Sequence, residues 1–238
     1  MPLQTVEPQR LYRQIAEQLR SLMVGGEFMP GSRLPAERDL ARQLGVSRPS
    51  VREALIALEV EGWVEVRTGS GVYVLERGGK ANGRAVKVPA SEWGPLELLR
   101  ARRVIEGEIA ALAATEARRK QVEAIRAAIA SMHDDADKGV QPRAGDRAFH
   151  TAVAQAAGNV VLSETVQTFW DARRGPLFEK LGAHFESVPS WRKAIAEHEL
   201  VYDAIQARDG NAAREAMHHH LDKAHSRFSA SWRRANAS

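Results

Sequence analysis

Hydrophobic residues recur every three or four positions in the first part of the chain and outline three short helices. The first spans residues 9–24 and is followed by a stretch rich in glycine and proline. The second spans residues 36–45, and the third begins after Ser47, a favourable N-cap residue. Residues 63–75 alternate between apolar and polar around a glycine turn, which predicts a two-stranded hairpin. This order of elements predicts a winged helix-turn-helix.

The pattern changes after the hairpin. Residues 77–92 have no apolar period and are rich in Gly, Lys and Arg, which predicts a linker. Nearly everything that follows has a helical period, in segments at roughly 94–117, 119–137, 144–157, 160–181, 190–208 and 211–234. We therefore expect a mainly α protein. Its parts are a winged domain over 1–76 (helix-turn-helix about 36–55, wing 63–75) and an all-helical bundle of six or seven helices over 93–238.

Composition narrows the class of protein. The 238 residues are 44% hydrophobic, which is enough for packed cores, and they include no cysteine, so disulfides and thiolate metal sites are excluded. No apolar run approaches the roughly 20 residues of a membrane helix, and the N-terminus lacks the apolar core of a signal peptide. We expect a cytoplasmic protein that has no membrane partner. The net charge of +4 is weak evidence for nucleic-acid binding.

The arrangement of polar residues on the third helix is more informative than net charge. Arg48 and Arg52 stand one turn apart near its N-terminus, on the face away from its apolar stripe, and Arg38 begins the preceding helix. Arginines so placed on a recognition helix can hydrogen-bond to guanine in the major groove of DNA. Ser47 and Ser50 suit contacts with phosphate. The alternative is that these arginines form a solvated helix face.

The small wing tip contains Thr68 and Gly69, which permit a close approach to DNA. The run RLPAERDLARQLGVSRPSVREALIALEVEGWVEVRTGSGVYV resembles the DNA-binding domain of the GntR superfamily. The resemblance implies that the three arginines and Gly69 contact an operator, although Thr68 stands where the family often has histidine. It also implies a homodimer that binds an inverted repeat in double-stranded DNA.

Four potential metal ligands lie on the inward stripes of the predicted bundle helices. They are Asp146, His150, His198 and His220. Each histidine alone could be an ordinary core residue, but one carboxylate and three imidazoles facing one interior favour a transition-metal site. Zinc is the first expectation, with nickel, iron or manganese as alternatives. Such a site would keep positions open for the oxygen atoms of a ligand.

Arg102 lies on an inward stripe as well, and a buried arginine needs an anionic partner. Glu106, one turn away, would make its role structural. The carboxylate of a small effector, bound bidentately, would make its role functional. A metal with three neutral imidazoles and one carboxylate keeps positive charge, and Arg102 adds to it. The pocket would therefore favour an anionic effector.

A second resemblance covers nearly all of residues 93–230. The segments DRAFHTAVAQAAGN and EHELVYDAIQARDGNAAREAMHHHL are similar to the metal-binding version of the FCD effector domain, which implies the FadR-type branch of GntR regulators. It implies the same four metal ligands and places Arg102 and Asn159 near the effector, although Asn159 could simply cap a helix. Residues 169–181 resemble regulators of hexuronate and sugar-acid catabolism. This resemblance implies that Arg173 belongs to the effector pocket; the alternative is that Arg173 lies on the surface.

These observations predict a transcription repressor that is released from its operator when a small carboxylic or sugar acid binds at a metal site. The alternative is a metal-dependent hydrolase or isomerase fused to a DNA-binding domain. That reaction would need a further acid or base beside an open metal position, and no such residue stands out in the sequence. We therefore expect a regulator and not an enzyme.

Overall fold

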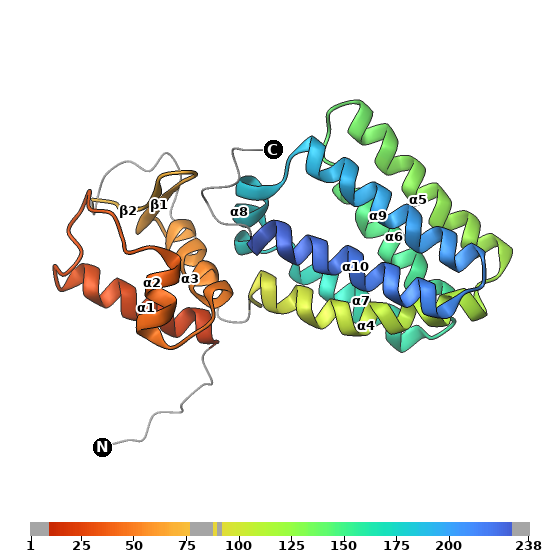
Figure 1. Cartoon of the computed structure of the whole chain (residues 1–238), viewed down its shortest axis with the longest axis horizontal. Coiled ribbons are helices and arrows are strands. Elements are labelled where there is room, and N and C mark those ends of the chain that lie inside the picture. The colour runs from red at the N-terminus through yellow and green to blue at the C-terminus, as the bar shows by residue number, and fades with distance from the viewer. Residues whose placement is uncertain (1–9, 77–87, 90–91, 230–238) are drawn as a thin grey trace, which may run out of the picture. The chain divides into compact units, whose positions relative to one another are not determined.

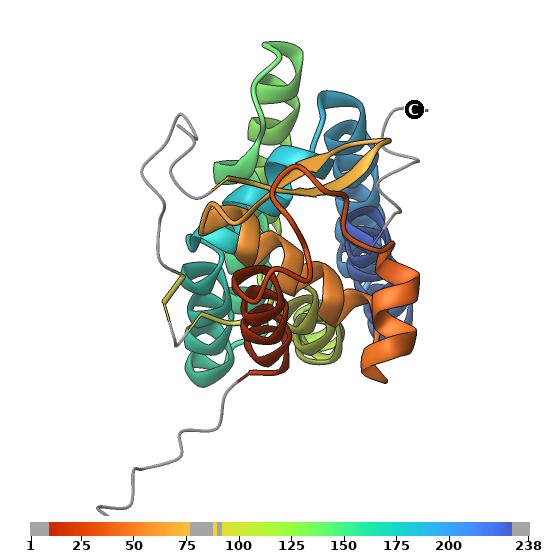
Figure 2. The same ribbon diagram turned by 90° about the vertical axis from the view of Figure 1, so that its left-hand side faces the viewer.

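The computed structural model describes residues 10–76, 88–89 and 92–229, and these form helices and one small sheet (Figures 1 and 2). Most of the predicted linker 77–92 lies outside the described residues, as do the end of the last predicted helix and residue 9. The elements in chain order are α1 (Leu11–Val24), α2 (Glu37–Leu44), α3 (Arg48–Val60), β1 (Val64–Arg67), β2 (Gly71–Val74), α4 (Pro95–Glu116), α5 (Arg119–Asp137), α6 (Arg143–Ala156), α7 (Val160–Ala172), α8 (Pro176–Phe185), α9 (Val188–Gln206) and α10 (Gly210–Ser229).

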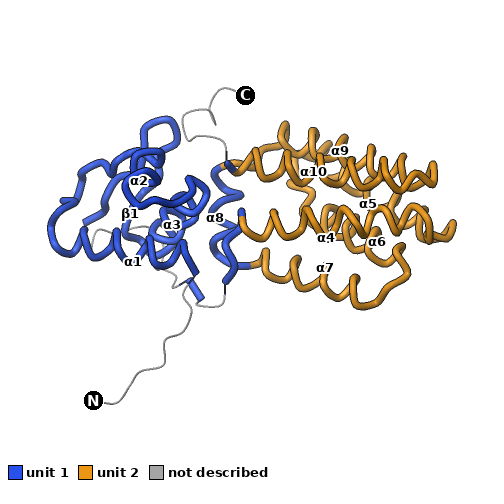
Figure 3. Tube along the Cα trace, turned by 60° about the horizontal axis from the view of Figure 1, so that its bottom comes forward, with its two compact units in different colours: residues 1–96, 175–184, 229–238 blue, residues 97–174, 185–228 orange. Residues whose placement is uncertain are grey.

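The chain forms two compact units, shown in different colours in Figure 3. Unit 1 covers residues 1–96, 175–184 and 229–238, and unit 2 covers residues 97–174 and 185–228. The predicted class is confirmed, because a winged helix-turn-helix is followed by a helical part. The division differs from the expected one in that α8 belongs to the unit of the winged elements.

The core of unit 1 forms around α3. Val51, Leu55 and Leu58 of this helix are fully buried, together with Leu19 of α1. The strands β1 and β2 pair antiparallel, with Val64 opposite Val74 at the open end of the hairpin. The helix and the wing are therefore held by one apolar core, which leaves the N-terminal end of α3 at the surface.

The predicted helix 160–181 is interrupted in the structure, because α7 ends at Ala172 and α8 begins at Pro176. Proline has no N–H to continue the helical ladder, and Gly175 has no side chain to cap the new helix. The buried Glu92 supplies the cap instead, since its carboxylate accepts a hydrogen bond of 3.0 Å from the Leu177 N–H. A Cβ at residue 175 would collide with that carboxylate. The prediction of one continuous helix was therefore wrong.

Unit 2 is a bundle in which α5 packs against α6 and α9, and α6 against α7. The approach of α5 to α6 is close because residue 145 is glycine. A Cβ there would lie 2.5 Å from the Cγ atom of Met132. The next residue, Asp146, is buried in the bundle interior. Among the described segments, we find no helix whose length and apolar character would let it cross a lipid bilayer.

Candidate functional site

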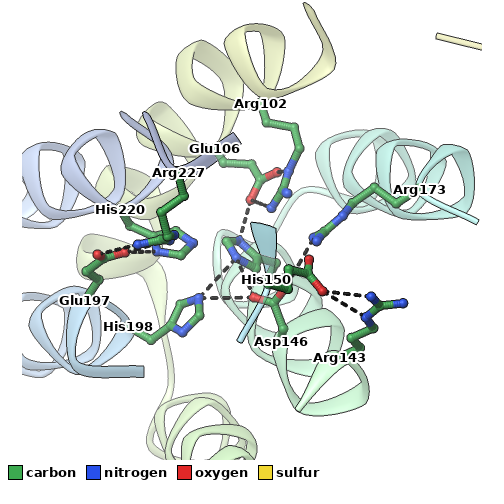
Figure 4. A network of polar contacts seen from close by, with 11 residues as sticks. Arg102, Glu106, Arg143, Asp146, His150, Arg173, Glu197, His198, His220 and Arg227 are labelled. Carbon is green, nitrogen blue, oxygen red and sulfur yellow. Dashed lines mark hydrogen bonds and ion pairs between the residues drawn. The ribbon is translucent and has the colours of Figure 1, made fainter. Parts of the chain in front are cut away.

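The four predicted metal ligands meet inside unit 2 (Figure 4). Asp146 and His150 stand one turn apart on α6, while His198 comes from α9 and His220 from α10. One ligand atom of each lies within 4.8 Å of all the others, and all four residues are buried. Two ligands bonded to one ion at about 2.1 Å would lie within roughly 4.2 Å of each other. A small contraction would therefore let the cluster hold a transition-metal ion.

The shortest contact in the cluster joins Asp146 and His198. The Oδ1 atom of Asp146 lies 3.2 Å from Nε2 of His198 and 3.5 Å from Nε2 of His150. Burial opposes ionisation of this carboxyl, but hydrogen bonds with His150 and His198 and the charge of Arg173 outweigh it, so its pKa lies well below the usual range. Burial also lowers the pKa of His198 and of His220. An ionised carboxylate and neutral imidazoles are the forms that bind metal.

Two of the imidazoles have a carboxylate on the nitrogen that faces away from the cluster. His150 Nδ1 lies 2.5 Å from Oε2 of Glu106, and His220 Nδ1 lies 3.0 Å from Oε2 of Glu197. Burial opposes ionisation of Glu106, but the charges of Arg102 and His150 prevail and lower its pKa. Helical spacing indicated Glu106 only as a partner for Arg102. It gave no sign of Glu197, which directly precedes His198 in the sequence but does not lie on the buried stripe of that helix.

A cavity of about 40 Å³ adjoins the cluster. Its lining includes Asp146, His220, Arg102, Arg173 and Arg227. This volume is enough for a water molecule, whereas sites for small molecules usually measure about 300–1,000 Å³. An organic acid would therefore have to displace some of the lining side chains in order to bind.

The two arginines predicted for the effector pocket both lie against the ring of Trp170. The guanidinium carbons of Arg102 and Arg173 are 4.8 Å and 4.0 Å from the centroid of Trp170. Arg102 is buried and is paired with Glu106, the structural partner predicted from the sequence. Its Nε atom lies 2.5 Å from Oε1 of Glu106. Arg173 lies 3.2 Å from Oδ2 of Asp146. Arg173 therefore contacts the cluster directly, Arg102 contacts Glu106, which lies beside His150, and both arginines line the cavity.

Asn159, also predicted for the pocket, does not line this cavity. Its side chain is exposed and accepts hydrogen bonds from the backbone N–H groups of Val161 and Leu162, which makes it the N-cap of α7. Arg173 lies at the opposite end of the same helix. The capping role explains this residue, and its placement beside the effector is corrected.

Two of the predicted DNA contacts are freely accessible in unit 1. The side chains of Arg38 and Arg48 are 82% and 50% exposed. Both line a surface cavity of about 390 Å³ that also includes Arg33 and Gly71. Arg33, which the sequence analysis did not single out, lies so close to Gly71 that an added Cβ would be 2.5 Å from its Nε atom. The cavity beside the recognition helix is therefore lined by three arginines, together with the carboxylates of Glu37 and Asp39.

Arg52 has a different environment from the one expected. It is 1% exposed, and its Nη2 atom lies 2.6 Å from Oε2 of the buried Glu37. A side chain committed to this interior ion pair does not reach a base in this conformation. In this conformation Arg52 has a structural role, in which it joins α3 to α2 through Glu37, and a contact of Arg52 with DNA stays a prediction.

The remaining DNA candidates lie at the start of α3 and at the wing tip. The hydroxyl of Ser47 accepts a hydrogen bond of 3.3 Å from the N–H of Ser50, so it caps the recognition helix. Thr68 is half-buried, while Gly69 is exposed and has a φ of +80°, a conformation that favours glycine in the tight turn. These positions are accessible for contacts with the DNA backbone.

Comparison with known proteins assigns the class. A model of the gntR family of bacterial regulatory proteins matches residues 11–74, and a model of the FCD domain matches residues 97–223. The chain therefore belongs to the GntR family, in its FadR-type branch, and carries an FCD domain. It is a DNA-binding transcription regulator, as the sequence predicted.

Particular relatives can also be named. The chain is 34% identical over 224 residues to the Uxu operon transcriptional regulator of Escherichia coli (strain K12), covering 92% of this chain and 87% of the relative. It is 36% identical over 224 residues to the Exu regulon transcriptional regulator of the same organism, covering 92% and 85%. The solved structure of Lar, which controls the Listeria monocytogenes agr system, shares the fold with a TM-score of 0.50 at 18% identity, covering 94% of this chain and 98% of that one.

Proposed function

We propose that this regulator is a repressor that leaves its operator when a small carboxylic or sugar acid binds at a metal site in unit 2. The observation that carries the proposal is the shared cavity, because three arginines and two potential metal ligands line the same space. We further propose that the protein acts as a homodimer on an inverted repeat, in keeping with the two-fold symmetric sites read by helix-turn-helix dimers.

Asp146, His150, His198 and His220 would hold a divalent transition metal, with zinc as the first choice. Three imidazoles and one carboxylate suit this group of ions, and four protein ligands leave positions free for others. When bound, the ion supplies a Lewis acid that can accept the carboxylate and hydroxyl oxygens of an effector. Arg102 and Arg173 would bind the same anion from the direction of Trp170.

The names of the relatives support sugar acids as the first effectors to test, because these proteins are called regulators of the Uxu operon and the Exu regulon. The arrangement of charges supports the same choice. Arg102 is buried and Arg173 is partly buried beside the cluster, and a guanidinium withdrawn from solvent is stabilised by an anion that it can bind bidentately.

Elemental analysis of protein purified without a tag tests the metal, and operator titration with added galacturonate or glucuronate tests the effector. We expect about one transition-metal ion per chain. We also expect weaker DNA binding when the acid is present. The variant His198→Ala/His220→Ala should lose both the metal and the response. Full metal retention in that variant would contradict the ligand set, and consumption of the acid would favour an enzyme instead.

A further inference from the structure

Two carboxylates outside the proposed ligand set contact two of the ligands. Building on the proposed metal site, we infer that Glu106 and Glu197 are positioning residues for the metal. Each holds one imidazole with its Nε2 atom directed at the ion, and each is itself held by an arginine that lines the cavity. The result is two chains of contacts, Arg102–Glu106–His150 and Arg227–Glu197–His220, which converge on the cluster (Figure 4).

The first chain of contacts is fully buried and begins on α4. Arg102 approaches Glu106 through two nitrogen atoms, Nε at 2.5 Å and Nη2 at 3.3 Å. The second oxygen of Glu106 lies 2.5 Å from Nδ1 of His150 on α6. This ion-pair contact puts a carboxylate beside Nδ1, an arrangement that favours the tautomer with its proton on Nδ1 and the lone pair of Nε2 free for a metal.

The second chain of contacts repeats the arrangement with different helices. Arg227 of α10 binds Glu197 of α9 bidentately, with Nη1–Oε1 and Nη2–Oε2 distances of 2.8 Å and 3.1 Å. Oε2 of Glu197 also lies 3.0 Å from Nδ1 of His220. Arg227 and His220 are both on α10, and the single carboxylate of Glu197 on α9 contacts both of them. It therefore holds both side chains in place.

The third imidazole provides an internal comparison. His198 is buried, and among the described residues its Nδ1 atom makes neither a hydrogen bond nor an ion pair, whereas Nδ1 of His150 makes the ion-pair contact with Glu106 but no hydrogen bond. The Nε2 atom of His198 contacts Oδ1 of Asp146 and lies 3.4 Å from Nε2 of His150. Two of the three histidines in the cluster therefore have a carboxylate beside Nδ1. This pattern is expected where the Nε2 atom of a histidine has to stay in a fixed position.

The sharpest test compares Glu197→Ala and Glu197→Gln with Glu199→Ala. Glu199 is a matched control, because it lies on the same helix and also contacts a histidine, His133 at 2.9 Å, but at the surface. The affinity for Zn²⁺ is measured by competition with a chromophoric chelator. We expect Glu197→Ala to bind Zn²⁺ about 10–100-fold more weakly, as for other partners of metal-ligating histidines. Glu199→Ala should match the wild type.

A second measurement separates positioning from general support of the fold. The ¹⁵N chemical shifts of the imidazoles in metal-free protein report which ring nitrogen carries the proton. We expect the His220 signals to show a fixed Nδ1–H form in the wild type and a mixture of both forms in Glu197→Ala. Glu197→Gln retains the size of the side chain and keeps the test valid if the alanine variant does not fold.

The outcomes distinguish this inference from the proposed function. If the wild type binds no Zn²⁺, the proposed metal site fails and the inference fails with it. If the wild type binds Zn²⁺ and both Glu197 variants bind it equally well with an unchanged His220 proton position, only the inference is overturned. Weaker Zn²⁺ binding together with a changed proton position supports it.

Discussion

Arg48 and Arg52 stand one turn apart on α3, yet they have opposite environments. The side chain of Arg48 is half exposed, whereas Arg52 is enclosed with Glu37. Spacing along a helix shows that two residues share a face, but it does not show whether a neighbouring element covers part of that face. Here α2 provides Glu37, and the buried carboxylate binds the arginine that lies nearer to the core.

Arg52→Ala should therefore destabilise the protein. Removing one partner of a buried ion pair leaves the other charge uncompensated, which costs about 3–5 kcal/mol of the free energy of unfolding. Urea denaturation followed by circular dichroism measures the loss. The matched control is Arg48→Ala, which should change stability by no more than about 0.5 kcal/mol. Equal stability of Arg52→Ala and the wild type would show that the pair is not structural.

Arg48→Ala should instead weaken DNA binding. An exposed arginine at the start of a recognition helix can bind guanine bidentately, and its loss costs about 1–3 kcal/mol and relaxes the preference for that base. Titration of an operator duplex and of variants with single base changes measures both effects. Arg119→Ala removes the same charge from an exposed position on α5 and should bind as the wild type does. An unchanged base preference in Arg48→Ala would contradict the assignment.

At the metal cluster, the sequence predicted the histidine ligands but not the carboxylate that contacts one of them. Helical periodicity identified His150, His198 and His220 as inward-facing, because the apolar neighbours on each helix define the buried stripe. It could not show that Glu197 would reach across to His220. That contact depends on how α9 and α10 pack against each other. From the sequence alone, a glutamate next to the buried stripe of a helix is predicted to be a surface residue.

At the scale of elements, the interruption between α7 and α8 shows how a distant residue can end a helix. The apolar residues of the segment continue at helical spacing, so periodicity predicts one helix. The structure begins a new helix at Pro176, and the buried carboxylate of Glu92 accepts a hydrogen bond from its first turn. By contrast, the helix predicted over residues 119–137 coincides with α5. Its N-cap and C-cap are the directly adjacent residues Arg118 and Lys138, so no distant residue is needed to end it.

Glu92→Ala should therefore destabilise the start of α8. Loss of a side-chain cap costs about 0.5–2 kcal/mol, and the Leu177 N–H would be left without its partner. Thermal unfolding of the variant, compared with the wild type, measures the change. Glu179→Ala removes an exposed carboxylate from the same helix and should have little effect. If both variants unfold at the same temperature as the wild type, Glu92 does not act as a cap.

For the molecule as a whole, the proposed metal ligands and the predicted DNA-contacting residues belong to different compact units. Removing the metal with a chelator should therefore leave operator affinity nearly unchanged in the absence of acid. It should abolish the response to the acid, because the effector loses the ion that accepts its oxygens. Operator titrations with and without chelator, each repeated with galacturonate, test this. A metal-free protein that still responds fully would place the effector elsewhere.

The final prediction concerns which chemical feature of the effector carries the signal. To move a regulator from 1% to 99% in its DNA-free state, an effector must prefer that state by about 5.5 kcal/mol. A single neutral hydrogen bond contributes only about 1 kcal/mol, whereas a bidentate arginine–carboxylate contact combined with metal chelation can reach the required value. Galacturonate should therefore release DNA at concentrations at which galactose, which lacks the carboxylate, does not.

The variant that tests this is Arg173→Ala rather than Arg102→Ala, because loss of Arg102 would also free the buried Glu106 that contacts His150. Arg173→Ala should bind the operator as the wild type does and require at least about 10-fold more galacturonate for release, the equivalent of roughly 1.4 kcal/mol. Zn²⁺ content is measured in parallel, since Arg173 also contacts Asp146. Release by galactose and galacturonate at equal concentrations, in protein that retains its metal, would show that the carboxylate is not recognised.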